Sequence, residues 1–210
     1  VVSVSQGFMR RRRDSVTLSF DETFRENLFA NVKDIKKVWY KNSLNGTLTY
    51  GETSSSVNIT AVETGYLEMY NLILEAGSFF NVTDNQEGTQ KIILNHDTAE
   101  SFFPDGDAVG KKIKVISSNI TFSFEVIGVL AEQTTGMENG SAFVPRGFYA
   151  KKISPNPTAA NVMVQATAAE KATSLVTSIK EYCTSLTGTE YSVNVTSMQS
   201  MLEQMSKITS

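Results

Sequence analysis

The sequence predicts an α+β fold in which a split β-α-β (ferredoxin-like) subdomain carries an inserted β-rich subdomain. The first part follows from the two ends of the chain. Patterns typical of a strand, a helix and a strand succeed one another in residues 1–43 and again in residues 153–210. The second part follows from residues 44–152, where apolar and polar residues often alternate with the period of two that strands show. Because two β-α-β halves can pack as one sandwich, we expect the two end segments to form one discontinuous domain.

The first β-α-β pattern begins with Val1–Ser5, whose alternation predicts a strand. Ser19 and Glu22 have the spacing of a capping box, so we expect Ser19 to open a helix. The apolar stripe of that helix recurs every three to four residues, at Phe24, Leu28, Val32 and Ile35. Val38–Tyr40 then predicts the second strand.

The second β-α-β pattern lies near the end of the chain. Val162–Val164 predicts a strand, and Thr167 and Glu170 repeat the capping-box spacing before a helix. The expected apolar stripe of this helix is Ala172, Leu175, Val176, Ile179 and Leu186. Gly188 follows where a left-handed C-cap would stand. A last strand is expected at the alternating residues Tyr191, Val193 and Val195.

Two further segments flank this half. Lys151–Thr158 contains Pro155 and Pro157, so we expect a hinge or linker between the subdomains. Ser197 is expected to cap a final helix with one apolar face: Met198, Met201, Leu202, Met205 and Ile208. That methionine-rich face suits ordinary packing or an adaptable partner surface.

The inserted region predicts mainly strands. A hairpin is expected from the alternation of Leu48, Tyr50, Val57, Ile59 and Ala61. Lys91–Asn95 predicts a short strand, and Asp97 with Glu100 predicts a capped helix that Pro104 ends. Two more strands are expected around Ile113–Val115 and Phe122–Val126, and Gly128 then indicates a bulge or a close backbone approach.

The order of these short motifs in the middle half of the chain resembles a known family. The motifs are G-x-x-F at Gly77–Phe80, a strand ending at Leu94, F-P at Phe103–Pro104, V-G-K-x-I-x-V around Gly110, V-I-G-V at Val126–Val129 and an apolar segment ending at Pro145. Together they are similar to the MacB-like periplasmic core domain, the extracytoplasmic domain of FtsX-type ABC transporter permeases. The residues that carry the family pattern are Gly77, Phe80, Leu94, Phe103, Pro104, Gly110, Ile127, Gly128, Val129 and Pro145.

The resemblance implies a function without catalysis in this domain. The split subdomain would be porter-like, and the domain would pass ATP-driven motion of membrane helices to an external partner or substrate, in export or mechanotransmission. Its partners would be a second permease copy, a cytoplasmic ABC ATPase that hydrolyses the ATP, and an adaptor protein, a lipoprotein or a peptide. Its place would be the extracytoplasmic side of the cell membrane, with both termini on one side of the domain. The candidate partner loop contains Gln133, Gly136, Met137 and Glu138.

An alternative interpretation is a free-standing secreted or cell-surface module that binds a protein or a glycan. Apolar segments directly flanking Val1 and Ser210 in the parent gene would favour the permease instead. The chain has no apolar run near the roughly 20 residues that span a bilayer. Six Asn-x-Ser/Thr sequons occur, which indicate glycosylation in a secreted eukaryotic protein or chance in a chain rich in serine and threonine: Asn45, Asn58, Asn81, Asn119, Asn139 and Asn194.

Composition and motifs exclude several other functions. The formal net charge of −3 argues against a nucleic-acid binder, and the basic run Arg10–Arg13 suits a solvated loop or an anionic lipid. Gly106–Lys112 is one residue too short for a phosphate-binding loop and precedes a strand. Acidic residues such as Asp105 and Asp107 are explained by turns, although they could bind a hard cation weakly.

Catalytic and metal sites find no support either. Cys183 is the only cysteine and His96 the only histidine, so a cysteine or histidine metal cluster is excluded by number. Cys183 is expected to be a partly buried structural thiol, and His96 a turn or surface residue. His96 and Asp97 would need a serine such as Ser141 to complete a catalytic triad, and no nucleophile-elbow motif supports one. We therefore predict no catalytic residue, no cofactor and no bound metal.

Overall fold

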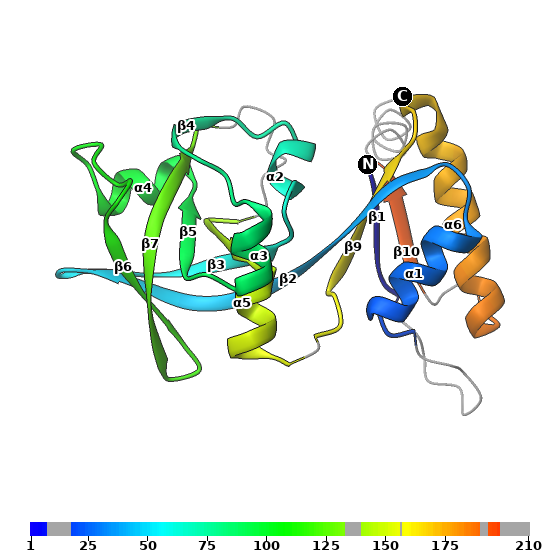
Figure 1. Ribbon diagram of the computed structural model, residues 1–210, viewed down its shortest axis with the longest axis horizontal. Coiled ribbons are helices and arrows are strands. Elements are labelled where there is room, and N and C mark those ends of the chain that lie inside the picture. Colours follow the sequence, from blue (N-terminus) through cyan, green and yellow to red (C-terminus); the bar gives the residue numbers. More distant parts are fainter. Residues whose placement is uncertain (8–17, 133–139, 156, 190–192, 198–210) are drawn as a thin grey trace, which may run out of the picture. The chain divides into compact units, whose positions relative to one another are not determined.

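The computed structural model describes residues 1–7, 18–132, 140–155, 157–189 and 193–197 (Figure 1). The fold is mixed α/β, and the chain divides into two compact units: residues 1–40 with 158–210, and residues 41–157. Within the described ranges, no helix has the length and apolar character needed to cross a membrane. The basic run Arg10–Arg13, the loop Gln133–Glu138 and the methionine-rich segment after Ser197 lie outside the described residues.

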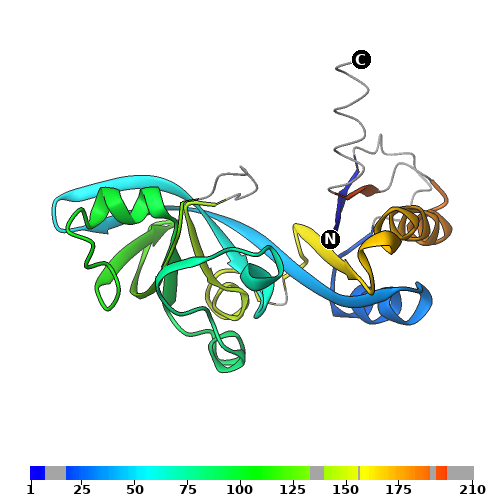
Figure 2. The same ribbon diagram turned by 90° about the horizontal axis from the view of Figure 1, so that it is seen from above.

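The first unit is a sheet covered by two helices. Its elements are β1 (Val2–Gln6), α1 (Glu22–Asn31), the first part of β2 (Ile35–Tyr50), β9 (Asn161–Ala166), a 3-10 turn at Ala169–Lys171, α6 (Ala172–Thr187) and β10 (Val193–Ser197). The strand order is β10-β1-β9-β2. Helices α1 and α6 lie side by side, and α6 contacts β1, β9 and β10 (Figure 1, Figure 2). The core between them includes Val4, Phe20, Leu28, Tyr40, Val162, Leu175 and Ile179.

The ends of the first unit meet in this sheet. β1 and β10 are antiparallel, and Val2 lies opposite Ser197. The chain before Val2 and the chain after Ser197 therefore leave the sheet at the same end. The prediction that both termini lie on one side is confirmed for the described residues.

The second unit is built mainly from strands. Its elements are the second part of β2, β3 (Thr53–Val62), α2 (Tyr66–Met69), β4 (Leu74–Gly77), α3 (Val82–Glu87), β5 (Lys91–Leu94), α4 (His96–Phe102), β6 (Lys112–Ser117), β7 (Ile120–Leu130), β8 (Ala142–Pro145), α5 (Arg146–Phe148) and a π-helical turn at Tyr149–Ile153. The β2–β3 hairpin is confirmed, with Tyr50 opposite Thr53 at its turn. β2 is much longer than the predicted strand Val38–Tyr40, because it runs on into this hairpin.

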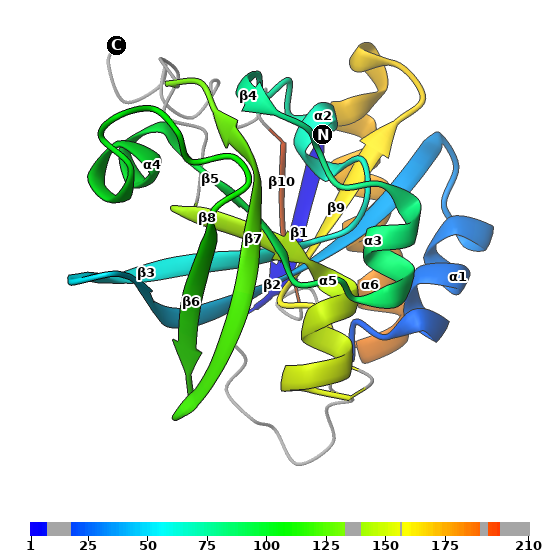
Figure 3. The same cartoon turned by 60° about the vertical axis from the view of Figure 1, so that its left-hand side comes forward.

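The strands of the second unit close into a ring. β2 pairs with β3, β3 with β8, β8 with β5, β5 with β7, β7 with β6, and β6 again with β2, as Figure 3 lets the reader follow. β4 adds to the outside of the ring on β7. Inside it, Phe148 packs edge-on against Phe122 and Phe124, with ring centroids 5.1 and 4.8 Å apart. The ring thus encloses an apolar core of its own.

The helix starts predicted from capping boxes are wrong. α1 begins at Glu22 because the Asp21 side chain, not that of Ser19, accepts the Phe24 N–H at 2.8 Å. The helix ends at Asn31, so Val32 and Ile35 belong to its C-cap and to β2.

The other two predicted caps fail in the same way. α4 is capped by Asn95, whose side chain accepts the Thr98 N–H at 2.8 Å, and Asp97 lies in its first turn. Before α6, the Thr167 N–H donates to the Asp34 carbonyl at 2.9 Å, and the helix starts without a side-chain cap. Gly188 does form the left-handed C-cap, with φ of 77°.

Three further predictions need correction. Leu186 is exposed, and Cys183 and Thr187 are buried on the core side of α6 instead. Helix α3 was not predicted, because the polar sequence of this segment indicates a turn. The helix forms there because Asn81 and Asp84 make a capping box. The expected linker from Lys151 begins with the π-helical turn, so only the part after Ile153 is irregular.

Candidate functional site

The family-pattern residues of the central motifs come together where β4, β7 and β5 meet. Gly77 on β4 lies opposite Gly128 on β7, and Val129 lies opposite Leu94 on β5. The register shifts at this point, so that Ile127 is the extra residue between the pairs. The Ile127 carbonyl accepts the Ser78 N–H at 2.9 Å, which ties the end of β4 to the bulge.

Two glycines allow this close approach. Gly77 has φ of 81°, and a Cβ placed on it would stand 2.0 Å from the Ile127 carbonyl oxygen. A Cβ on Gly128 would stand 2.7 Å from the Ser78 carbonyl oxygen. Backbone therefore packs directly on backbone here, which only glycine permits. The prediction of a bulge or close approach at Gly128 is confirmed.

The remaining pattern residues line the core or its turns. Phe80, Phe103 and Pro145 are buried, and the Phe103 ring lies 4.6 Å from that of Tyr50. Pro104 and Gly110 are exposed in the turn before β6. Three of the pattern residues, Phe103, Pro104 and Val129, line a small pocket of about 170 Å³, whose rim includes His96 and Glu100. The candidate partner loop Gln133, Gly136, Met137 and Glu138 lies outside the described residues.

His96 stands between two carboxylates at the start of α4. Its Nδ1 lies 2.7 Å from a Glu75 oxygen, and its Nε2 lies 3.6 Å from a Glu100 oxygen. The hydrogen bond with Glu75 raises the pKa of His96, and the charges of Glu75, Glu100 and Glu132 add to the rise. Both ring nitrogens face carboxylates, so this histidine is not placed as a base for a serine.

The same cluster contains groups that could ligate a cation. The ligand atoms of His96, Asp97 and Glu100 lie within 4.8 Å of one another. All three residues are partly or fully exposed, and the Glu100 carboxylate already pairs with the imidazole. We therefore interpret the cluster as a surface ion pair, and we assign no metal to it.

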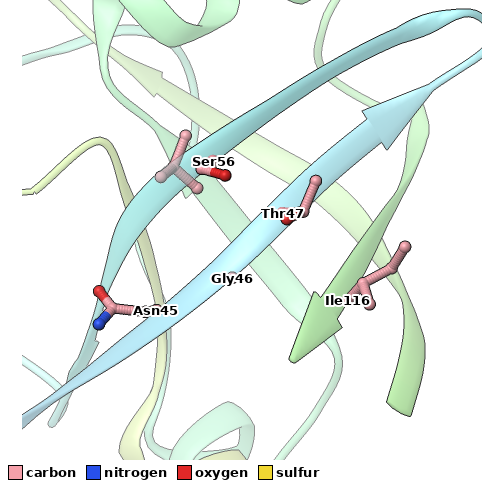
Figure 4. A pocket seen from close by; sticks show the side chains of 6 residues that line it. Asn45, Gly46, Thr47, Ser56 and Ile116 are labelled. Atoms are coloured by element: carbon pink, nitrogen blue, oxygen red, sulfur yellow. The ribbon is translucent and has the colours of Figure 1, made fainter. Parts of the chain in front are cut away.

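A shallow hollow of about 430 Å³ lies on the outside of the ring. Asn45, Gly46 and Thr47 of β2 form its floor with Ser56 and Val57 of β3, and Ile116 of β6 forms a wall (Figure 4). A Cβ on Gly46 would point toward the core and stand 3.3 Å from the Ile116 carbonyl and from two core side chains, so this glycine lets β2 pack closely beneath the hollow. The hollow is uncharged, and its polar groups are hydroxyls and an amide.

Sequence reasoning missed the polar face around this hollow. The pairs that face outward on the β2–β3 hairpin are Asn45 with Asn58, Thr47 with Ser56, and Thr49 with Ser54. The signal was present, since serine, threonine and asparagine recur at every second residue in both strands. Strands were predicted from the alternation of apolar residues, so the alternating polar residues were not recognised as one outward face of the hairpin.

A buried arginine marks the boundary of the second unit. Arg146 donates from Nε to the Asn42 side chain at 2.8 Å and from Nη2 to the Pro157 carbonyl at 3.0 Å. Its Nη1 lies 3.9 Å from a Glu63 carboxylate oxygen. Arg146 and Glu63 expose only 8% and 14% of their side chains, so the charge is largely removed from water. The arrangement holds together the points where the chain enters and leaves the unit.

Cys183 is a structural thiol, as expected. It is fully buried in the first unit, and burial raises its pKa to about 11. A thiol with so high a pKa is a poor nucleophile at neutral pH.

The sequence matches a family model and several curated relatives. The model of the MacB-like periplasmic core domain matches residues 1–182. The macrolide export ATP-binding/permease protein MacB of Neisseria gonorrhoeae is 27% identical over 140 residues, which cover 66% of this chain and 21% of that protein. The MacB protein of Rhodopseudomonas palustris is 27% identical over 108 residues, 49% of this chain and 16% of that protein. The chain thus spans about a fifth of the length of the curated relatives it matches.

Solved structures share the fold. The extracellular domain of the noncanonic ABC-type transporter YknZ from Gram-positive bacteria aligns with a TM-score of 0.72 at 21% identity, covering 93% of this chain and 99% of that one. The periplasmic region of MacB from Actinobacillus actinomycetemcomitans aligns with a TM-score of 0.75 at 19% identity, covering 98% of this chain and 92% of that one.

Proposed function

The chain belongs to the family of MacB-like periplasmic core domains, the extracytoplasmic domains of ABC transporter permeases, and from this premise we propose that it transmits ATP-driven motion to an external partner or substrate. Domains of this kind are generally non-catalytic, and the ATPase is a separate region. Here it would be a cytoplasmic subunit or domain that drives two permease copies. The external client would be an adaptor protein, a lipoprotein, a peptide or, as the names of the relatives suggest, a macrolide.

The observation that carries the proposal is the pairing of Val2 with Ser197. A domain inserted between two membrane helices must receive its chain and return it on the same side. Adjacent ends in one sheet also mean that a displacement of the two flanking segments acts on one pair of hydrogen-bonded strands, β1 and β10. Since close-packed interiors are only slightly compressible, such a displacement would move the unit as a body.

We infer also that the unit of residues 1–40 and 158–210 is the porter-like subdomain with a split ferredoxin-like layout. Its element order is β1-α1-β2, then β9-α6-β10, and its strand order is β10-β1-β9-β2. Residues 41–157 would be the inserted β-rich subdomain. The sequence predicts the two boundaries at residues 43/44 and 152/153.

The proposal can be tested in the full permease with its ATPase. A spin label on Gln86→Cys, an exposed position of α3, would report the distance between the two copies. Buried Cys183 should not take the label. ATP should change this distance, and an ATPase variant that cannot hydrolyse ATP should not cycle it.

Flexible insertions in the two flanking segments distinguish a domain that transmits motion from one that only binds a partner. Gly-Ser insertions before Val2 and after Ser197 should abolish the ATP-driven change in distance while ATP hydrolysis continues. The matched control is the same insertion between Ser118 and Asn119, an exposed turn of the second unit. An unchanged distance response with both terminal insertions would contradict the transmission role and leave the family membership untouched.

A further inference from the structure

Strand β3 has an edge that no described strand covers. β2 pairs with β3 from Thr53 to Val62, whereas β8 pairs with it only from Ile59 onward. One side of the segment Thr53–Val57 therefore has no strand partner among the described residues. Unpaired strand edges are templates for association with another chain.

The backbone groups that this edge offers can be identified. The Asn58 carbonyl accepts the Ser141 N–H at 3.1 Å, so the backbone of Asn58 points away from β2. Successive residues of a strand direct their N–H and C=O groups to opposite edges. Ser54 and Ser56 therefore point their N–H and C=O groups to the same side as Asn58, and both residues are exposed.

Among the described residues, the edge also lacks the features with which proteins commonly protect such strands. Those features are lysines or other charges, prolines, bulges and covering segments. No charged residue or proline occurs from Thr53 to Asn58, and the register of β3 against β2 is regular along its length. Glu52, in the turn before the strand, is the nearest charge along the chain.

The sequence of the edge is complementary to itself. Thr53-Ser54-Ser55-Ser56-Val57 is almost symmetric about Ser55, because threonine and valine have the same shape. An antiparallel copy centred on Ser55 would place Ser54 opposite Ser56, Thr53 opposite Val57 and the Glu52 carboxylate opposite neutral Asn58. No like charges face each other in this register, and the bulkiest facing pair is one of β-branched residues.

We propose that the Thr53–Val57 edge of β3 is a docking surface for a second copy of this chain, paired antiparallel about a two-fold axis at Ser55. Ser54 of one copy and Ser56 of the other exchange N–H···O=C bonds, and the two-fold axis repeats this pair on the other side of Ser55. Ser55 faces its own copy as a non-hydrogen-bonded pair. The contact joins the rings of the two copies through their β3 strands.

Size and polarity make this pairing weak for the free chain. Stable protein interfaces bury roughly 1,200–2,000 Å² in total, far more than a five-residue edge of small polar side chains can supply. Two copies held in one membrane protein would meet at effective concentrations on the order of millimolar, where weak edge pairing forms. This role in a permease dimer rests on the proposed function, whereas the pairing itself does not.

Disulfide trapping gives a direct test on the chain itself. Facing residues of a non-hydrogen-bonded antiparallel pair have Cα atoms about 4.5 Å apart, inside the roughly 4.4–6.8 Å range of disulfides. Ser55→Cys should form a covalent dimer under mild oxidation at least about tenfold faster than Ser54→Cys. The two Ser54 residues are offset along the paired strands, so they lie outside that range. Cys183 is present and buried in both variants, so its background is equal.

A second pair of variants tests the backbone bonds. In the Ser55→Cys chain, Ser56→Pro removes an outward N–H without removing a bond to β2, as edge strands tolerate. Ser56→Ala keeps that N–H and removes only the hydroxyl. We expect Ser56→Pro to slow trapping at least about tenfold and Ser56→Ala to leave it unchanged, with melting temperatures confirming that both variants fold.

Two outcomes would overturn the pairing. Equal trapping of Ser55→Cys and Ser54→Cys would show random collision, or an edge that serves another occupant such as a client peptide. Equal trapping of the proline and alanine variants would show that strand pairing is not involved. Neither outcome bears on the ATP-driven distance change, so the two proposals fail separately.

Discussion

Gly77 cannot carry a side chain where β4 meets β7, and this gives a prediction at the residue scale. Gly77→Ala combines a positive φ with a Cβ that would overlap the Ile127 carbonyl, so we expect a loss of about 3 kcal/mol or more in the free energy of unfolding. Gly110 is the matched control, because its φ is 92° and a Cβ there meets nothing within 4 Å. Gly110→Ala should cost only the backbone strain, roughly 1–2 kcal/mol. Urea unfolding of both variants measures the difference, and equal losses would contradict the close approach.

His96 gives a prediction about pH. Its folded-state pKa is raised, chiefly by the hydrogen bond to Glu75. The stabilising contribution is therefore fully present below the ordinary pKa of histidine and is lost as pH rises through the raised folded-state pKa. In an NMR titration of the ring protons, His96 should titrate above the usual histidine range. Glu75→Gln should lower its pKa, whereas Glu26→Gln, in the other unit, should not; an unshifted pKa in Glu75→Gln would contradict the ion pair.

At the element scale, helix α4 allows the observed N-cap, Asn95, to be compared with the predicted one, Asp97. Asn95→Ala removes the acceptor for the Thr98 N–H and should cost about 0.5–2 kcal/mol. Asp97→Ala, at the position the sequence favours as the cap, should cost less, because Asp97 lies within the first turn and contributes only through the helix dipole. Chemical denaturation of the two variants gives the order, and a larger loss for Asp97→Ala would mean that the helix begins where the sequence predicts.

The misplaced caps show what short-range sequence patterns can and cannot establish. Two of the predicted caps had a competitor two residues away, Asp21 beside Ser19 and Asn95 beside Asp97. Spacing alone does not decide between them, because the choice depends on which side chain the preceding loop turns toward the helix. The same reasoning explains why the β2–β3 hairpin was found: its strands are adjacent in sequence and a tight turn joins them.

Pairing between distant strands could not be predicted from the sequence. The ring depends on parallel pairing of β3 with β8 and of β5 with β7, between residues far apart in the chain. Alternation indicates that a segment is a strand but says nothing about its neighbour. The free edge of β3 was hidden for the same reason, since it exists only because β8 begins to pair at Ile59. Gly128, by contrast, already indicated a bulge or a close backbone approach, because a glycine interrupts an alternating strand there.

At the scale of the whole molecule, the chain builds two separate cores. In the second unit, Arg146 links the point where the chain enters to the point where it leaves. Its guanidinium joins Asn42, just past the start of that unit, to Pro157 at its end. Arg146 follows Pro145 directly at the end of β8, and neighbouring Gly147 is held against α3 by an N–H bond to Asn85 at 2.9 Å. The buried charge is therefore positioned by a strand, a helix and both connections at once.

This arrangement predicts a large effect for a change that keeps the volume of the side chain. Arg146→Met should lower the free energy of unfolding by about 3–5 kcal/mol, because it removes the guanidinium from a buried ion pair with Glu63 and a buried hydrogen bond with Asn42. The control is Lys111→Met, which breaks an exposed pair with Asp107 and should cost no more than about 1 kcal/mol. Denaturant unfolding gives both values. Amide exchange should in addition show faster opening at Asn42–Leu44 in Arg146→Met alone, because only that variant releases β2 from the end of the unit. A loss as small as that of Lys111→Met, with β2 still protected, would mean that the β2–β3 pairing suffices to hold the boundary and that the arginine does not.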